Sequence, residues 1–246
     1  MQAVILAGGK GTRLAPYTKV LPKPLMPIGD APILEIILLQ LRQAGVHRVF
    51  LAVGHMAGLL RAFFQDGQRL GIHIEYCYEP KPLGTAGPIA GIPGLTGTFI
   101  VSNGDVLTTM NLGELLAFHQ RHRAIATIAM HHRTVPVDYG VIECDGDHRI
   151  TGYREKPDLD HMVSMGMYVF EPSILEYIQP NDYLDFPELV QVLISAGEKV
   201  VGFPFGGYWM DLGRKEDYER AVEDFPSISH LLPLEEADRD VASATG

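Results

Sequence analysis

The sequence is poor in cysteine, in long apolar runs and in positive charge. Its two cysteines, Cys77 and Cys144, are too few for a disulfide framework, and no CxxC pair is present to form a zinc site. Apolar runs such as residues 36–39 fall far short of the ~20 residues that cross a membrane. The first residues reach glycine too soon to form the apolar region of a secretion signal. We therefore expect a cytoplasmic protein without a membrane segment.

The charge balance argues against one class of partner. Lys and Arg total 20 against 30 Asp and Glu, which gives a net charge of −10 among 246 residues. Such an acidic chain is poorly suited to neutralising a nucleic-acid backbone, so we do not expect a nucleic acid as partner. The length and the 46% content of hydrophobic residues fit one large globular domain. A homo-oligomer is left open, because the pattern does not separate surface from core apolar residues.

Short apolar runs alternate with segments of helical periodicity along the chain. Residues 3–7 form a continuous apolar run bounded by glycine, typical of a strand buried on both faces. This alternation predicts an α/β fold, with a Rossmann-like, mixed, mostly parallel central sheet and helices on both faces. Strands are expected at 3–7, 48–53, 73–78, 99–102, 126–131, 140–143, 150–154, 165–170 and 199–203, and helices at 33–41, 56–64, 112–122, 172–178, 186–196 and 215–223. One domain should span 1–225, followed by a polar tail, 226–246, that frays.

The loop after the first expected strand is rich in glycine. Residues 8–13 read Gly-Gly-Lys-Gly-Thr-Arg, and glycine lets backbone N–H groups approach a phosphate closely. Arg13 adds a planar, permanently charged group. The plainer interpretation is a tight turn between strand and helix. Neither standard nucleotide pattern applies, because Leu14 stands where a dinucleotide fingerprint needs its last glycine and no Walker A motif occurs.

A single lysine lies between two prolines shortly afterwards. Pro22 and Pro24 flank Lys23 in an otherwise uncharged segment, and proline stiffens the chain by fixing φ. A lysine on a stiff segment loses little extra entropy when it is positioned, which suits a point charge aimed at a phosphate. The alternative is a lysine in a solvated loop.

Together these segments resemble a known family, the sugar-1-phosphate nucleotidyltransferases, and look closest to the mannose-1-phosphate guanylyltransferases. The resemblance covers residues 1 to about 224. It implies a nucleotidyltransferase catalytic domain that joins the nucleotidyl part of an NTP to a sugar 1-phosphate and releases pyrophosphate, with Mg²⁺ as cofactor. No hexapeptide repeats are present, so no left-handed β-helix domain is expected. The matching motifs are residues 8–18, 22–27, 84–87, 103–105, 139–141, 155–157 and 209–213.

The resemblance also implies catalytic roles for four residues. Asp105 and Asp211 would be the metal ligands, and two carboxylates with substrate phosphates suit Mg²⁺. Arg13 would hold the leaving pyrophosphate and Lys23 the α-phosphate under attack. A general base is not required, because the attacking phosphate, whose second pKa is about 6, is already mostly dianionic at neutral pH.

Two sets of binding residues follow from the same resemblance. Ser164 stands where many relatives carry asparagine, so its inclusion rests on position alone. Lys156 would bind the phosphate of the sugar, and Glu155 would accept hydrogen bonds from the sugar hydroxyls. The nucleotide-binding set is Leu6, Ala7, Gly8, Gly9, Gly11, Thr12, Arg13, Lys23, Glu79, Gly84, Thr85 and Asn103, and the sugar-phosphate set is Gly140, Glu155, Lys156 and Ser164.

The identity of the base and the sugar stays open. A carboxylate at Glu79 can accept from guanine N1–H and N2–H, whereas uracil and thymine offer one imide donor between two carbonyls. This favours GTP and mannose 1-phosphate, with a glucose-1-phosphate thymidylyl-, uridylyl- or cytidylyltransferase as the alternative. A catalytically silent regulatory homologue that binds a sugar nucleotide is the alternative of another class, and an NAD-dependent dehydrogenase is disfavoured by the missing third glycine.

Overall fold

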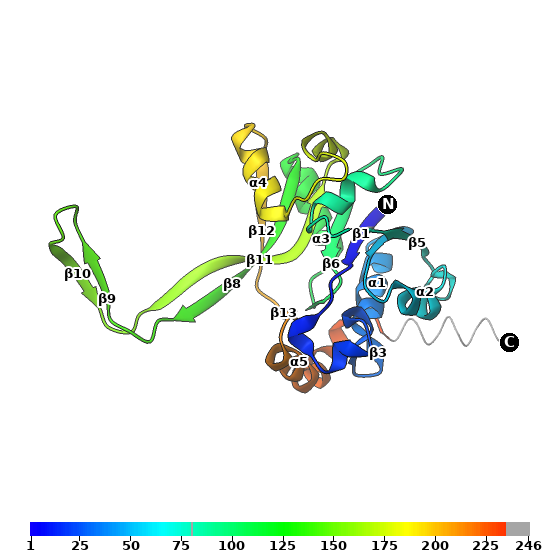
Figure 1. Ribbon diagram of the computed structural model, residues 1–246, viewed down its shortest axis with the longest axis horizontal. Helices are drawn as coiled ribbons and strands as arrows, with labels where there is room; N and C mark the ends of the chain where they lie inside the picture. The colour runs from blue at the N-terminus through cyan, green and yellow to red at the C-terminus, as the bar shows by residue number, and fades with distance from the viewer. Residues whose placement is uncertain (80, 235–246) are drawn as a thin grey trace.

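A seven-stranded mixed sheet forms the centre of the protein (Figure 1). The computed structural model describes residues 1–79 and 81–234. The strands lie in the order β12-β8-β11-β6-β1-β4-β5. The sheet comprises β1 (Gln2–Ala7), β4 (Arg48–Val53), β5 (His73–Tyr78), β6 (Phe99–Asn103), β8 (Ala126–Pro136), β11 (Asp158–Phe170) and β12 (Val200–Phe205). Neighbouring strands pair in parallel except β11, which is antiparallel to β6 and β8. The expected mixed, mostly parallel sheet is confirmed.

Both faces of the sheet are covered. Along β1, Ala3 and Ile5 pack into one core cluster and Val4 into the other, because successive side chains of a strand point to opposite faces. Residues of α1, α2, α3 and α5 belong to the first cluster, and those of α4 and two 3-10 turns to the second. Helices on both faces are therefore confirmed. The helices are α1 (Ile33–Gln43), α2 (Ala57–Phe64), α3 (Leu112–His122), α4 (Phe186–Ser195) and α5 (Lys215–Ile228).

Several short elements were not expected from the sequence. The strands β7 (Val106–Thr108) and β13 (Trp209–Asp211) pair antiparallel, as do β2 (Pro27–Ile28) and β3 (Ala31–Pro32). Strands of two or three residues give no periodic signal, so a sequence pattern does not reveal them. The segment expected as a helix at 172–178 is a 3-10 turn, Pro172–Tyr177.

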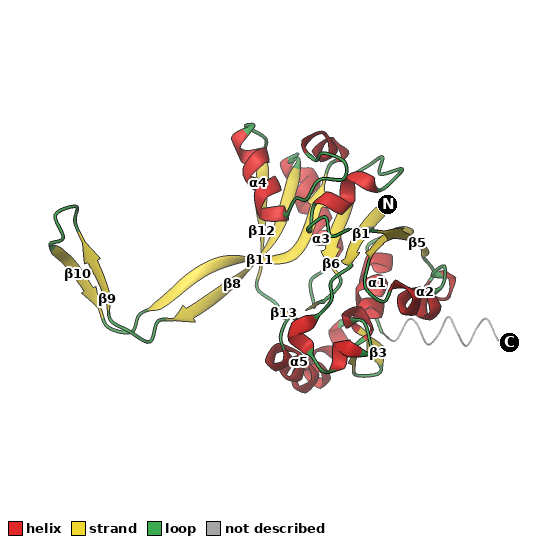
Figure 2. Ribbon diagram, in the orientation of Figure 1, coloured by secondary structure: helices red, strands yellow, loops and turns green. Residues whose placement is uncertain are grey.

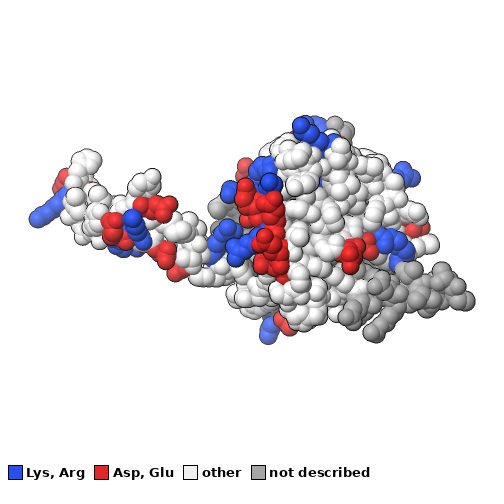
Figure 3. Space-filling model, turned by 90° about the horizontal axis from the view of Figure 1, so that it is seen from below, with Lys and Arg blue, Asp and Glu red and all other residues white. Residues whose placement is uncertain are grey.

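The largest departure from expectation is a long ribbon that leaves the body of the molecule. β8 and β11 continue past the expected limits, 131 and 165, towards a second pair, β9 (Val141–Cys144) and β10 (Ile150–Arg154), which confirms the strands expected at 140–143 and 150–154. We call residues 131–164 the arm. It stands clear of the other elements in Figures 1 and 2, and again when seen from below in Figure 3. No residue of the arm is buried, and a ribbon exposed on both faces lacks the apolar alternation by which strands are predicted.

The C-terminal helix also runs further than expected. α5 ends at Ile228 rather than at 223 and includes Pro226. Ile228 and Leu232 are each 6% exposed and belong to the core. Residues 226–234 of the expected tail thus pack on the body, and the rest of that tail lies outside the described residues. No helix within 1–79 or 81–234 has the length and apolarity needed to cross a membrane.

Candidate functional site

The glycine loop after β1 is held by close backbone packing. A Cβ on Gly54 would lie 3.1 Å from the carbonyl oxygen of Gly8, so the loops after β1 and β4 touch through backbone alone. Gly11 has φ of 61°, a left-handed conformation that glycine adopts without strain. Its carbonyl accepts from Leu14 N at 2.9 Å and from Thr18 Oγ1 at 2.7 Å. These contacts fix the start of the 3-10 turn Thr12–Leu14, which carries Arg13.

The short pair β7–β13 brings the two predicted metal ligands together. Asp105 lies in the turn between β6 and β7, and Asp211 is the last residue of β13, in register with Val106. Leu212 N donates to the Asp105 carbonyl oxygen at 3.0 Å. Two segments more than a hundred residues apart thus present carboxylates to one place at the carboxyl end of the sheet.

Both predicted cations lie at the same place. Lys23 Nζ donates to Asp105 Oδ2, and the lysine side chain is 10% exposed. A Cβ on Gly213 would lie 3.3 Å from both carboxylate oxygens of Asp211 and 3.5 Å from Arg13 Nη2. The structure therefore brings Arg13, Lys23, Asp105 and Asp211 into one cluster. The alternative of a solvated loop lysine is wrong for Lys23.

The surroundings of Asp211 disfavour its ionised form. The pKa of Asp211 is raised because its surroundings remove water from the carboxylate, and the charge of Asp105 raises it further. Lys23 and Arg13 act in the opposite direction without cancelling the effect. Within this cluster the ionised form of Asp211 therefore needs more positive charge than the two side chains supply.

The donor set fits Mg²⁺. Among the described residues, no group of three or more His, Cys, Asp or Glu side chains is placed to hold a metal ion. A pair of carboxylates is nevertheless what Mg²⁺ takes from proteins when substrate phosphates and waters complete its octahedron. The raised pKa of Asp211 agrees, because a bound cation would favour the ionised form that loss of water and the charge of Asp105 disfavour.

A cavity of about 580 Å³ lies beside this cluster. It is formed by the loops that follow β1, β4, β5 and β6, where an open α/β sheet binds ligands. Of the predicted nucleotide-binding residues, Leu6, Gly8, Gly9, Glu79, Gly84, Thr85 and Asn103 line it. The others, Ala7, Gly11, Thr12, Arg13 and Lys23, lie on the adjoining end of β1, the glycine loop and the turn Lys23–Leu25.

One wall of the cavity depends on a residue that sequence reasoning missed. Asp185 accepts from Thr85 N at 2.8 Å and from Thr85 Oγ1 at 3.0 Å, and Thr85 Oγ1 in turn accepts from Phe186 N at 2.9 Å. Asp185 and Glu188 also form the capping box of α4. The sequence Asp-x-x-Glu signals such a helix start, but nothing in it points to Thr85, a hundred residues earlier. Lys10, His55, Lys81 and Tyr183 line the cavity and were missed as well.

Glu79 faces the glycine loop. A Cβ on Gly8 would lie 2.9 Å from Glu79 Oε1, so a side chain at position 8 would collide with the carboxylate. Burial raises the pKa of Glu79, and a hydrogen bond from the Leu83 backbone opposes the rise. The carboxylate is thus held by backbone at one side of the cavity.

The predicted sugar-phosphate residues are divided between two places. Ser164 lies at the base of the arm, where Gly166 N donates to its Oγ at 3.3 Å, and a Cβ on Gly166 would come within 2.5 Å of Asn103 Nδ2. Gly140, Glu155 and Lys156 lie in the arm where β8 and β11 give way to the pair β9–β10. Within one chain, the structure does not bring these three residues to the carboxylate cluster.

Two of these distant residues, Gly140 and Glu155, lie close together. Tyr153 OH donates to Glu155 Oε2 at 2.9 Å, and a Cβ on Gly140 would lie 3.1 Å from that oxygen. Lys156 has φ of 43°, a left-handed conformation that costs a non-glycine residue about 1–3 kcal/mol and is often found at functional positions.

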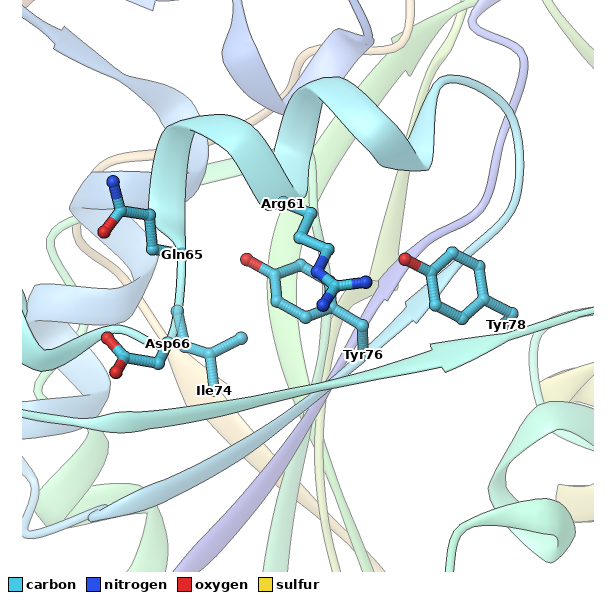
Figure 4. Close-up of a pocket in the computed structure, with 6 residues that line it drawn as sticks. All are labelled: Arg61, Gln65, Asp66, Ile74, Tyr76 and Tyr78. Carbon is cyan, nitrogen blue, oxygen red and sulfur yellow. The ribbon is translucent and has the colours of Figure 1, made fainter.

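A second hollow of about 520 Å³ lies between α2 and β5 (Figure 4). It shares no lining residue with the cavity beside the carboxylates. Tyr76 lies in its wall, and burial raises the pKa of this tyrosine to about 12. β5 is the outermost strand on its side of the sheet, which separates this hollow from the metal cluster.

The sheet order and the position of the site define a class, the nucleotide-diphospho-sugar transferase fold. A family model described as nucleotidyl transferase matches residues 2–227, and the chain belongs to that family. The structure of HddC from Yersinia pseudotuberculosis is 27% identical, with a TM-score of 0.71 over 91% of this chain and 99% of that one. The same protein complexed with GMP-PN gives a TM-score of 0.68.

Two curated relatives show how far the similarity extends. A UTP-glucose-1-phosphate uridylyltransferase from Synechocystis is 35% identical over 90% of this chain and 62% of its own length. A mannose-1-phosphate guanylyltransferase from Mycobacterium tuberculosis is 36% identical over 91% of this chain and 64% of its own length. The chain thus spans a little over three fifths of the length of these relatives.

The electrostatics of the cluster predict how Asp211 affects stability. Because the pKa of Asp211 is raised, the folded chain binds more protons than the unfolded chain, so ionised Asp211 costs stability above its folded pKa and less as the pH falls. We expect Asp211→Asn to raise the Tm measured without divalent ions at about pH 7, and the gain to shrink towards about pH 4. Differential scanning calorimetry measures both.

Asp182→Asn, at an exposed carboxylate outside the cluster, is the control and should leave Tm unchanged. Added Mg²⁺ should raise the Tm of the natural chain and not that of Asp211→Asn. A lower Tm for Asp211→Asn at neutral pH would show that the carboxylate is net favourable in the fold, contrary to this interpretation.

Proposed function

We propose that the protein transfers a nucleotidyl group from an NTP to a sugar 1-phosphate and releases pyrophosphate. The observation that carries the proposal is the convergence of Arg13, Lys23, Asp105 and Asp211 beside a cavity lined by the glycine loop. Membership of the nucleotidyl transferase family and the activities for which both curated relatives are named support it.

The positions of these residues relative to the cavity indicate the role of each. The NTP would lie in the cavity, with its base between Glu79 and Thr85 and its phosphates over the glycine loop. Arg13, on the exposed turn after that loop, would hold the leaving pyrophosphate. Lys23, nearly buried, would hold the α-phosphate, and a cation fixed in a partly dry site stabilises charge at a transition state without further reorganisation.

Asp105 and Asp211 are the residues that would hold Mg²⁺. When bound, the ion would draw phosphate oxygens together and neutralise the charge that develops on them. No residue is needed as a base, because the sugar phosphate already carries a nucleophilic oxygen at neutral pH. The chain's own task is to position two polyanions, and positioning alone can account for a large part of a rate enhancement.

A panel of substrates tests the reaction. We expect pyrophosphate release when the purified protein is incubated with an NTP, a sugar 1-phosphate and Mg²⁺ together. We expect none when any of the three is left out. Each of GTP, UTP, dTTP and CTP would be paired with mannose and glucose 1-phosphates. Binding of sugar nucleotides without turnover in every pairing would favour the silent regulatory homologue instead.

Lys23→Ala tests the catalytic cluster. We expect kcat to fall by at least ~100-fold with the fold intact, the scale of one lost transition-state donor, because Lys23 is the buried cation bonded to Asp105. Steady-state kinetics measure the loss, and circular dichroism checks the fold. Lys19→Ala, at an exposed lysine four residues earlier, should keep near-normal turnover. Normal turnover in Lys23→Ala would contradict the assignment.

Glu79 favours a guanine base, and with it mannose 1-phosphate as the sugar. Its carboxylate lies in the cavity wall and can accept two donors from guanine. The guanylyltransferase relative and the GMP-PN complex of HddC agree with this choice, whereas the uridylyltransferase relative keeps the uridylyl alternative open.

Glu79→Gln should therefore reduce the preference for GTP. A glutamine has one acceptor and one donor where the carboxylate has two acceptors, so we expect the ratio of kcat/KM for GTP to that for UTP to fall about tenfold. The ratio is measured by competing the two nucleotides. Glu114→Gln, an exposed carboxylate on α3, is the control, and an unchanged ratio in Glu79→Gln would exclude base reading by this residue.

A further inference from the structure

A buried glutamine is bonded to the strand pair that carries the two carboxylates. Gln40 lies on α1 and is 6% exposed. Its Nε2 donates to the Thr108 carbonyl oxygen at 2.7 Å, and Thr108 is 1% exposed. The other polar atom of the Gln40 side chain, Oε1, is buried and has no hydrogen-bond partner among the described residues. A buried polar atom without a partner is rare in folded proteins and calls for an explanation.

Stability alone does not favour a glutamine at this position. The residues around Gln40 on α1, 36–39 and 41, are all buried and apolar. An apolar side chain would continue that face without burying an unpaired acceptor, which costs stability. What the glutamine adds is its bond to the backbone of β7, so the role of Gln40 should be found in that strand.

β7 and β13 lie outside the seven-stranded sheet. Within the described residues they pair with each other and with no strand of that sheet, so no ladder of backbone bonds fixes them to the body. The turn before β7 is tied at one point, where Gly104 N donates to the Leu6 carbonyl oxygen at 2.9 Å. Gln40 supplies a second bond at the other end of β7. Two fixed points give a short strand a defined direction, which one point does not.

The end of β7 that Gln40 holds is also joined to β13. The Thr108 hydroxyl donates to the Tyr208 carbonyl oxygen at 2.9 Å and accepts from Met110 N at 3.2 Å. Thr109 N donates to the same Tyr208 oxygen at 3.0 Å, and Tyr208 N donates to Thr109 Oγ1 at 3.2 Å. Tyr208 directly precedes β13. A displacement of Thr108 would therefore pass to β13, which presents Asp211.

We propose that Gln40 is a positioning residue for the divalent metal. By fixing Thr108 it sets the direction of the β7–β13 pair, and with it the placement of Asp105 beside Asp211. This inference rests on the proposed function, in which the two carboxylates hold Mg²⁺. The loss of a residue that orients metal ligands typically lowers metal affinity or activity by about 10–100-fold.

Metal binding without substrates tests this role. Gln40→Met keeps an unbranched side chain of similar length and removes the donor to Thr108. The probe is Mn²⁺ alone, which takes the same oxygen ligands as Mg²⁺ and is followed by electron paramagnetic resonance. We expect the Kd for Mn²⁺ to rise about tenfold in Gln40→Met, while circular dichroism shows an intact fold.

Gln2→Met is the matched control. Gln2 Nε2 donates to the Gly94 carbonyl oxygen at 2.7 Å, a bond of the same kind and length at the amino end of β1, away from the carboxylates. Its loss should leave the Kd for Mn²⁺ unchanged. Thr108→Val removes the hydroxyl that joins β7 to Tyr208 and should weaken Mn²⁺ binding as Gln40→Met does. It decides the question if Gln40→Met does not fold.

A double-variant cycle separates positioning from a general loosening of the fold. Asp211→Asn should weaken Mn²⁺ binding by itself. In that background Gln40→Met should add little, because no pair of carboxylates is left to hold in place. The proposal is overturned by unchanged Mn²⁺ binding in Gln40→Met, by an equal loss in Gln2→Met, by an undiminished further loss in the Asp211→Asn background, or by Mn²⁺ binding that does not depend on Asp211. If no NTP supports turnover, the proposed function fails, while the Mn²⁺ titrations still decide the role of Gln40.

Discussion

The placement of two carboxylates side by side is the constraint on which the site depends. Backbone pairing of β7 with β13 holds Asp105 and Asp211 together whether or not their charges agree. The pKa of Asp211 is raised first by loss of water around the carboxylate and then by the charge of Asp105, and Lys23 and Arg13 offset a part of the rise. A site built in this way is unfavourable for the isolated chain and favourable for one that binds a cation and phosphates, which is the usual trade between stability and function.

The rest of the cavity is arranged so that backbone can approach a ligand. The contact between Gly8 and Gly54 brings two loops together without side chains, and the bonds from Thr85 to Asp185 fix the opposite wall. Asp185 also caps α4. One residue therefore links the stability of a helix to the position of a binding loop, and its loss would disturb both.

The arm is the part of the chain that lies furthest from the rest of the site. Its large apolar side chains are exposed, and within one chain the structure holds Gly140, Glu155 and Lys156 away from the carboxylate cluster.

The sequence by itself determined the sheet, the helices and the chemistry of the motifs. The apolar run at 3–7 and the periodicity at 33–41 are strong signals, because a buried strand or helix imposes a continuous or periodic pattern on the residues that face the core. The resemblance carried by residues 8–27, 103–105 and 209–213 identified the candidate phosphate cations Arg13 and Lys23 and the candidate metal ligands, since such groups have few chemical substitutes.

Only the tertiary structure decided which of these residues meet. The pairing of Asp211 with the turn at Asp105, and the bond from Thr85 to Asp185, join segments about a hundred residues apart through strands or caps too short to leave a pattern. The extension of β8 and β11 into an arm was equally hidden, because a ribbon with two exposed faces has no core to impose alternation on it. Local sequence records burial within an element, whereas the distance between elements depends on how the whole chain packs.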